Sequence, residues 1–167
     1  MRLGLSTIAS PIGELTLAAR DGRLCLLHFG ADGADVRRTL ERWYRDTPIE
    51  RDPDPAGAAT ALAKYFAGDL NALDAIEIEL KGTPFQRRVW EALRTVRAGT
   101  TRSYADLARA VNAVPAVRAV GAANGANPVA LVVPCHRIIG TNGSLTGYGG
   151  GLERKQWLLH HEGVLML

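Results

Sequence analysis

The sequence predicts an α/β (α+β) chain with a small N-terminal domain of mixed sheet and helix, followed by a mostly helical domain. Two observations carry this prediction. In residues 1–30, short alternating or apolar runs are separated by turn residues, as in antiparallel strands. Beyond residue 81, apolar residues recur at helical spacing behind two capping patterns. We place the domains at residues 1–80 and 81–167.

Three strands are expected near the N-terminus, at residues 2–8, 13–20 and 23–29. Asp21-Gly22 separates the last two runs and is a strong signal for a tight hairpin turn. A further strand is expected over residues 76–80, where Ile and Leu alternate with Glu.

Two helices are expected between these strands. Val36 and Leu40 recur at helical spacing and predict a helix over about residues 35–45. The second helix begins near Pro55, a residue suited to the first helical turn, and ends at the breaker Gly68.

The second domain is expected to contain a helix-turn-helix. A first helix begins at Thr83, where a cap residue and a proline follow the capping-box pattern. Ser103 caps a second helix in a similar way. A third helix follows Pro115 and runs to about Asn124, with Gly125 in the C-cap position. The second and third helices, with their short connection, have helix-turn-helix dimensions.

The composition is typical of a protein made for a reducing compartment. The 167 residues include two cysteines, Cys25 and Cys135, which cannot build a disulfide framework. The N-terminus lacks the basic and apolar regions of a signal peptide, and no run approaches the about 18 apolar residues of a membrane span. We therefore expect a cytoplasmic protein without a membrane partner.

Charge is distributed unevenly along the chain. Residues 1–79 hold nine Lys and Arg against thirteen Asp and Glu, a net charge of −4. Residues 80–167 hold eleven against four, a net charge of +7. A basic half joined to an acidic half indicates a surface built for a polyanion such as nucleic acid. The alternative is that these charges are solvated helix faces.

Cys135 is the residue that most strongly suggests chemistry. It follows an apolar run and directly precedes His136 and Arg137. A cysteine reacts as its thiolate, and cationic or proton-accepting neighbours lower the pKa of a thiol. These neighbours favour a reactive Cys135 over the alternative, a buried inert cysteine. Adjacent side chains on a strand face opposite ways, so a Cys135–His136 pair requires a turn or a bridging water.

Residues 127–138 read Asn-Pro-Val-Ala-Leu-Val-Val-Pro-Cys-His-Arg-Ile. This run resembles the active-site signature of the O6-alkylguanine-DNA alkyltransferases. The resemblance extends over about residues 82–163. Its other blocks are Ser103-Tyr104, residues 116–121, Gly147-Tyr148 and residues 161–163. Five blocks in the right order make the signal specific. Residues 1–80 resemble the family weakly, mainly over residues 10–15.

The resemblance implies DNA repair by direct reversal of damage. Cys135 would take the alkyl group from O6-alkylguanine, and also from O4-alkylthymine, in duplex DNA. A thioether is not readily reversed, so each molecule would act once. Because guanine O6 lies inside the base stack, the damaged nucleotide must be flipped out. The expected partner is double-stranded DNA carrying O6-alkylguanine, for a nucleoid-associated monomer with no cofactor, metal or obligate protein partner.

The resemblance also implies roles around the thiol. His136 would reach Cys135 through a water, and Glu162 would orient His136, as in catalytic triads. Asn127 would hold the Asn-Pro turn against the active-site backbone, whereas Arg137 is expected to be structural. Without the resemblance, Glu162 is a solvated helix-end residue and Asn127 an ordinary turn residue.

Four residues are implied in the substrate pocket. Tyr104 matches a tyrosine whose hydroxyl faces the base, and Val133, Tyr148 and Gly149 would complete the pocket. The residues alone leave Tyr104 equally open to a core position. Ala130 stands where some relatives have proline, and Gly149 where some have serine. These smaller residues imply a roomier pocket that accepts bulkier alkyl groups.

Three residues are implied in DNA binding. Arg118 matches an arginine that fills the space left by the flipped nucleotide, although a lone helical arginine is usually just solvated. Small residues such as Gly121 let this helix approach DNA closely, in the minor groove and with weak sequence specificity. Ser103 belongs to the matched block at the start of the preceding helix.

Two rival functions and one metal site are the alternatives. A DNA-binding module that only flags lesions would lack the thiol, so Cys135 argues against it. A Cys–His hydrolase would need an oxyanion hole and would turn over. Cys25 and His28 suggest a metal, but a structural zinc site needs about four ligands, and a core cysteine on a strand is preferred.

Overall fold

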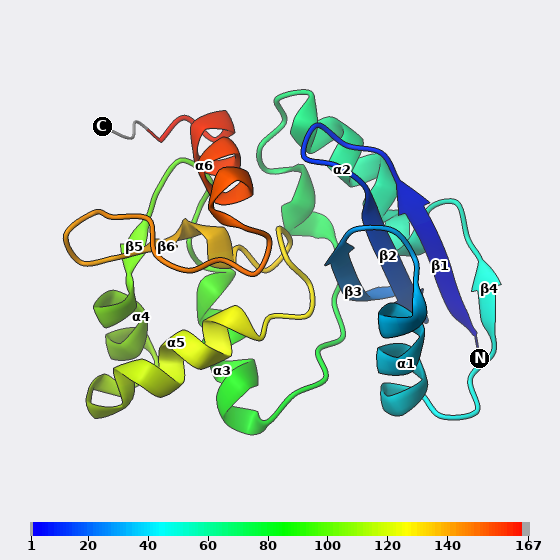
Figure 1. Ribbon diagram of the computed structural model, residues 1–167, viewed down its shortest axis with the longest axis horizontal. Helices are drawn as coiled ribbons and strands as arrows, with labels where there is room; N and C mark the ends of the chain where they lie inside the picture. The colour runs from blue at the N-terminus through cyan, green and yellow to red at the C-terminus, as the bar shows by residue number, and fades with distance from the viewer. Residues whose placement is uncertain (1, 165–167) are drawn as a thin grey trace. The chain divides into compact units, whose positions relative to one another are not determined.

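The computed structural model describes residues 2–164 and consists of two units, Met1–Lys81 and Gly82–Leu167 (Figure 1). The first unit combines a sheet with helices, and the second is mostly helical. The predicted fold class is therefore confirmed. Within the described residues, no helix is long and apolar enough to cross a membrane.

A four-stranded sheet in the order β3-β2-β1-β4 forms the first unit. Its strands are β1 (Leu3–Ile8), β2 (Leu15–Arg20), β3 (Arg23–Phe29) and β4 (Ile49–Arg51). The first three strands are antiparallel, as the hairpin signal predicted, and β4 runs parallel to β1. Asp21 and Gly22 both have positive φ, 52° and 74°, which a tight hairpin turn requires.

Helices cover the sheet because β2, one of its two inner strands, is buried on both faces. Residues 15–19 of β2 are all buried. Helix α1 (Ala34–Trp43) packs Val36 and Leu40 against one face. A 3-10 turn (Pro55–Gly57) contacts the sheet and leads into α2 (Ala58–Phe66), and a second 3-10 turn spans Ala72–Ala75.

Two details of the first unit differ from the sequence prediction. Residues 76–80 do not form a strand, because Ile78 makes only a single bridge, to Leu24. The segment is held by two backbone hydrogen bonds around Leu24, to Glu77 and Glu79 (2.8 and 2.9 Å). Strand β4 was not predicted, since three residues are too few to show a period.

The second unit contains four α-helices and a two-stranded parallel sheet among its described residues. They are α3 (Pro84–Leu93), β5 (Arg102–Ser103), α4 (Tyr104–Ala110), α5 (Val117–Gly125), β6 (Ile138–Ile139) and α6 (Leu152–His161). Thr83 and Ser103 both form the capping boxes that were predicted. Helix α5 runs one residue further than predicted, because Gly125 is helical and Ala126 is the C-cap.

Helix α3 anchors the helix-turn-helix formed by α4 and α5. The buried indole of Trp90 donates to the Ala123 carbonyl near the end of α5 (2.8 Å). A Cβ at Gly82 would lie 2.5 Å from the Trp90 ring, so only glycine fits there. α5 is thereby fixed directly before the loop that carries Cys135.

Candidate active site

Cys135 lies at the end of a buried loop that turns repeatedly. Leu131 has a positive φ of 70°, and the Cys135 amide donates to the Val133 carbonyl (2.8 Å). Residues Cys135–Arg137 then form a 3-10 turn. The chain therefore has, at this point, the turn that a Cys–His pair requires.

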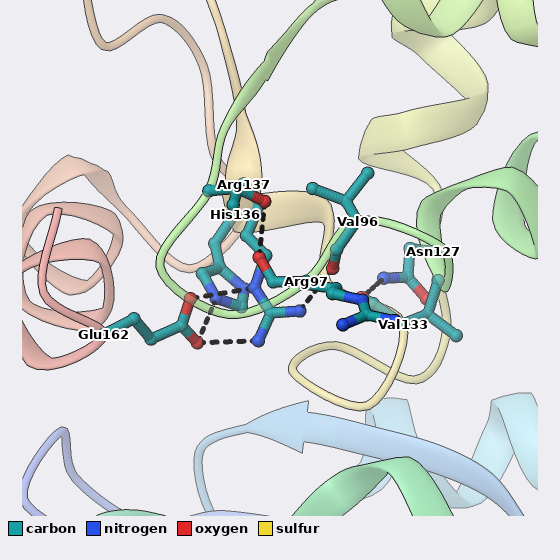
Figure 2. Close-up of polar contacts among 8 residues, drawn as sticks. Val96, Arg97, Asn127, Val133, His136, Arg137 and Glu162 are labelled. Carbon is teal, nitrogen blue, oxygen red and sulfur yellow. Dashed lines mark hydrogen bonds and ion pairs between the residues drawn. The ribbon is translucent and has the colours of Figure 1, made fainter. Parts of the chain in front are cut away.

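Asn127 fastens this loop through its side chain (Figure 2). Its Nδ2 donates to the Val133 carbonyl (2.6 Å), and its Oδ1 accepts from the Val129 amide (2.9 Å). The same side chain contributes to lowering the pKa of the Cys135 thiol. One amide thus holds the backbone beside the cysteine and favours the thiolate form of its sulfur.

His136, Arg137 and Glu162 form a buried cluster (Figure 2). His136 Nε2 lies 2.9 Å from Glu162 Oε2, and two nitrogens of Arg137 donate to the two carboxylate oxygens (2.8 and 2.9 Å). Arg137 also donates to the Val96 carbonyl (2.6 Å). The carboxylate is therefore fixed by two side chains, and Arg137 lies in the core of the segment, as predicted.

In this cluster His136 is neutral, and its Nδ1 can still accept a hydrogen bond or a proton. Burial lowers the pKa of His136, although Glu162 acts in the opposite direction. Burial alone would raise the pKa of Glu162, but hydrogen bonds from His136 and Arg137 hold it far below its ordinary value. A neutral imidazole that donates from Nε2 to Glu162 carries a lone pair on Nδ1. That atom is buried and has no hydrogen-bond partner.

The expectation that its neighbours lower the pKa of Cys135 is wrong for the resting protein. Burial raises the pKa of this thiol, and contributions from Asn127, Lys155 and Tyr148 only partly oppose it. The sequence shows the neighbours of a cysteine but not its desolvation, which here is the larger effect.

Lys155 is a buried residue of the site that the sequence reasoning missed. Its ammonium donates to the carbonyls of Ile138 (2.6 Å), Thr146 (3.0 Å) and Gly147 (3.4 Å). It therefore joins α6 to β6 and to the glycine-rich loop. A signal existed, because Lys155 falls on the apolar stripe of α6, three and four residues before buried leucines.

The predicted pocket residues come from three segments of the second unit. The Tyr104 hydroxyl at the start of α4 donates to the Thr146 carbonyl (3.3 Å), and its side chain is half-buried. Tyr148 is half-buried and contributes to lowering the pKa of the Cys135 thiol. Val133 is buried, whereas Gly149 is exposed with open space where a Cβ would lie.

The predicted DNA-binding residues lie on or beside the helix-turn-helix. Arg118 is exposed in the first turn of α5. A Cβ at Gly121 would lie 3.8 Å from the Tyr104 ring, an ordinary van der Waals contact, so the packing of α5 against α4 does not require glycine there. The Ser103 hydroxyl accepts from the Asp106 amide (3.0 Å) and is thereby occupied in capping α4.

Cys25 and His28 do not form a metal site. Cys25 is buried in β3, and its thiol donates to the Ala18 carbonyl (3.3 Å). Over residues 2–164, no three His, Cys, Asp or Glu side chains are placed to hold a metal ion. Cys25 is a core residue of the first sheet.

Known proteins match the whole chain. Two family models match it: the 6-O-methylguanine DNA methyltransferase ribonuclease-like domain over residues 4–80, and the DNA binding domain of the same name over residues 84–164. The methylated-DNA–protein-cysteine methyltransferase of Salmonella typhimurium is 46% identical over 170 residues, covering 100% of this chain and 99% of that protein. Its namesake from Mycolicibacterium paratuberculosis is 51% identical over 156 residues, covering 92% and 88%. A crystal structure of Mycobacterium tuberculosis OGT in complex with DNA is 44% identical, with a TM-score of 0.77 over 97% of this chain and 92% of that one. The chain therefore belongs to the 6-O-methylguanine DNA methyltransferase family, as its cysteine motif predicted.

Proposed function

We propose that the protein repairs alkylated DNA by transferring the alkyl group of O6-alkylguanine, once, to Cys135. The observation that carries this proposal is the state of His136, which is held by Glu162 through Nε2 and keeps an unpartnered lone pair on Nδ1. A neutral histidine next to a protonated thiol supplies the base that a buried cysteine needs. O4-alkylthymine presents a comparable alkylated exocyclic oxygen and is the second proposed substrate.

The reaction is a single in-line displacement. The Cys135 proton passes to His136 Nδ1 through one water, and the Glu162 carboxylate stabilises the imidazolium that forms. The thiolate then attacks the alkyl carbon, so that the S–C bond forms while the C–O6 bond breaks. The electron pair of the broken bond stays on guanine, which takes up a proton from the Tyr104 hydroxyl, and the proton held by His136 then returns through water to the tyrosinate. The products are unmodified guanine and a thioether on Cys135.

The pocket is formed by the loops that Asn127 and Lys155 hold in place. Lys155 binds the carbonyls of Thr146 and Gly147, directly before Tyr148 and Gly149. We assign Tyr148, Gly149 and the backbone at Val133 to contacts with the damaged base. The open space at Gly149 favours acceptance of bulky alkyl groups.

The second unit is proposed to bind the DNA, and the first to be structural. A net charge of +7 over residues 80–167 suits the phosphate backbone, so binding should weaken steeply with salt. Arg118 is proposed to fill the gap left by the flipped nucleotide, with Ser103 and Gly121 on the DNA-facing side. We further propose that the protein acts as a monomer in the cytoplasm, at the nucleoid.

Intact-mass spectrometry after incubation with an O6-methylguanine duplex tests the proposal. The protein should gain the mass of one CH2 group and then stop, with the methyl group located on Cys135 by fragmentation. Repeated turnover, or methylation of Cys25, would contradict it. A chromogenic ester should not be hydrolysed, which separates the proposal from a Cys–His hydrolase.

Arg118→Ala separates flipping from chemistry. Extruding a nucleotide costs a few kcal/mol, and each 1.4 kcal/mol corresponds to about tenfold in rate. The variant should therefore repair duplex DNA about tenfold or more slowly. It should react normally with free O6-benzylguanine, which needs no flipping. Equal loss of both reactions would mean that Arg118 supports the fold or the pocket.

A further inference from the structure

Asn124 is a buried polar residue of the second unit that has no part in the reaction described above. The residue is 5% exposed and lies near the end of α5. Its Oδ1 is buried and accepts no hydrogen bond from the described residues. A buried carbonyl oxygen without a partner lowers stability, so native structures keep few of them. Each one calls for an explanation, and a ligand that it binds is such an explanation.

The position of Asn124 on α5 directs its side chain toward the proposed substrate pocket. Residues three apart in a helix share one face, and helical side chains lean toward the preceding turn. One turn before is Gly121, where an added Cβ would meet the Tyr104 ring at 3.8 Å and, outside its own helix, no other described residue within 4 Å. One turn after, just beyond the C-cap, is Asn127, whose Nδ2 donates to the Val133 carbonyl (2.6 Å). Asn124 therefore lies between two contacts with pocket residues, and it leans toward the one where α5 carries no side chain.

We propose that Asn124 Oδ1 accepts a hydrogen bond from the exocyclic 2-amino group of the alkylated guanine and thereby sets the preference of the site for this base. The inference rests on the proposed function. Alkylation of O6 removes the hydrogen from N1, so the 2-amino group is the only N–H donor that the base of an O6-alkylated deoxyguanosine retains. Because a carbonyl oxygen can only accept, the amino group is the one polar group of this base that Asn124 Oδ1 can bind.

Two side chains would then recognise the base with opposite polarity. The Tyr104 hydroxyl donates to the Thr146 carbonyl in the structure (3.3 Å), and it can donate equally to the ring nitrogens of guanine, which are acceptors. Asn124 supplies the complementary acceptor. A site built to hydrogen-bond a substrate N–H rejects an analogue that lacks it, because the buried acceptor is then left unpaired. O6-alkylhypoxanthine is that analogue, since it differs from O6-alkylguanine only by the missing amino group.

Two variants of the full chain separate an acceptor from a residue that only fills space. Asn124→Leu keeps the approximate volume but removes the acceptor, whereas Asn124→Asp keeps an oxygen at the same place. Asn71→Leu is the matched control, since Asn71 is exposed and its side chain makes no capping hydrogen bond. The readouts are thermal unfolding and the rates of reaction with free O6-benzylguanine and free O6-benzylhypoxanthine, neither of which needs flipping.

The parent protein and Asn124→Asp should react with O6-benzylguanine about tenfold faster than with O6-benzylhypoxanthine, the effect of one buried hydrogen bond. Asn124→Leu should react with the two bases at nearly equal rates, and its rate with O6-benzylhypoxanthine should match or exceed that of the parent. It should also unfold at a higher temperature, because apolar atoms replace an unpaired buried oxygen. Asn71→Leu should keep the parental preference.

A parent protein that reacts equally fast with both bases would overturn the inference, whatever the variants do. So would an Asn124→Leu protein that keeps the parental preference, loses both reactions equally, or unfolds at a lower temperature, since Asn124 would then support the fold. A parent protein that reacts with neither base and accepts no methyl group from an O6-methylguanine duplex would instead overturn the proposed function.

Discussion

Each unit of the molecule buries one cysteine next to a tyrosine and near an Arg–Glu pair. The two thiols differ in whether a base is available to deprotonate them. In the first unit, Cys25 lies where the register of β2 and β3 shifts, and its thiol donates to a carbonyl. Burial raises its pKa to about 11. In the second unit, burial also raises the pKa of Cys135, but a neutral His136 with an unpartnered nitrogen follows it.

The two carboxylates extend the comparison. Glu79 accepts from Arg20 (2.9 Å) and from the Tyr44 hydroxyl (3.2 Å), and its side chain is 26% exposed. Glu162 accepts from Arg137, and its side chain is fully buried against His136. Burial and an Arg–Glu pair are thus common to both clusters. What distinguishes the second cluster is a base that is oriented on one side and open on the other.

The largest expected difference is between the two thiols themselves. Cys135→Ala should abolish methyl transfer completely while retaining duplex binding, because no other group in the site can form the thioether. Cys25→Ala should transfer one methyl group at the parental rate and lose about 1 kcal/mol of stability through a small cavity. Mass spectrometry and thermal unfolding measure the two effects. Residual methyl transfer by Cys135→Ala would mean that another residue accepts the methyl group.

The next difference concerns the two carboxylates. Glu162→Gln removes the charge that stabilises the imidazolium, so transfer to free O6-benzylguanine should slow by roughly a hundredfold. Glu79→Gln should leave that rate unchanged and lower the free energy of unfolding by about 1 kcal/mol, since the partly exposed pair is screened by solvent. If both variants reacted at the parental rate, Glu162 would be as structural as Glu79.

Lys155→Met is expected to have a smaller effect. It tests whether the Lys155 charge opposes the raised pKa of Cys135. Its charge is one of the contributions that oppose the raised pKa of Cys135. Without it, transfer should slow by about tenfold, and the rise of the rate with pH should move to higher pH. Lys64→Met, at an exposed position of α2, is the matched control and should change neither quantity. A slower rate with an unmoved pH profile would mean that Lys155 acts only by positioning the loop.

The comparison also shows which features the sequence could predict. The hairpin at Asp21-Gly22 and the caps at Thr83 and Ser103 could be predicted because they are local. Their turn conformations and capping hydrogen bonds involve only residues close by in the sequence. Helix α5 was predicted to within one residue for the same reason. The segment around Ile78 has the pattern of a strand, but strand formation depends on an available partner edge.

The active-site motif could be identified from residue types, whereas the pKa shifts and contacts of its side chains could not. Cys135, His136 and Glu162 were named from the resemblance, and the structure brings His136 and Glu162 into contact across 25 intervening residues. The predicted direction of the pKa shift at Cys135 was wrong because desolvation depends on the tertiary structure. Lys155 was passed over because lysine is usually solvated, although its place on an apolar helix stripe was visible.

The smallest expected effect is the pH dependence of stability, and it belongs to the second unit. Because the pKa of His136 is lower in the folded chain, the unfolded chain binds more protons once the pH falls below the unfolded value of about 6.5. Stability should therefore be full above that pH and decline below it, by about 1.4 kcal/mol for each unit of pKa shift. The Glu162 contribution has the opposite origin, a lowered carboxyl pKa, and is lost only below the unfolded value of about 4.3.

Denaturant unfolding between about pH 7 and pH 5 thus isolates the contribution of His136. His136→Gln should flatten this slope, whereas His160→Gln, at an exposed position of α6, should keep it. A parental slope in His136→Gln would mean that His136 is already protonated in the folded protein, and the base in the proposed reaction would then have to be another group.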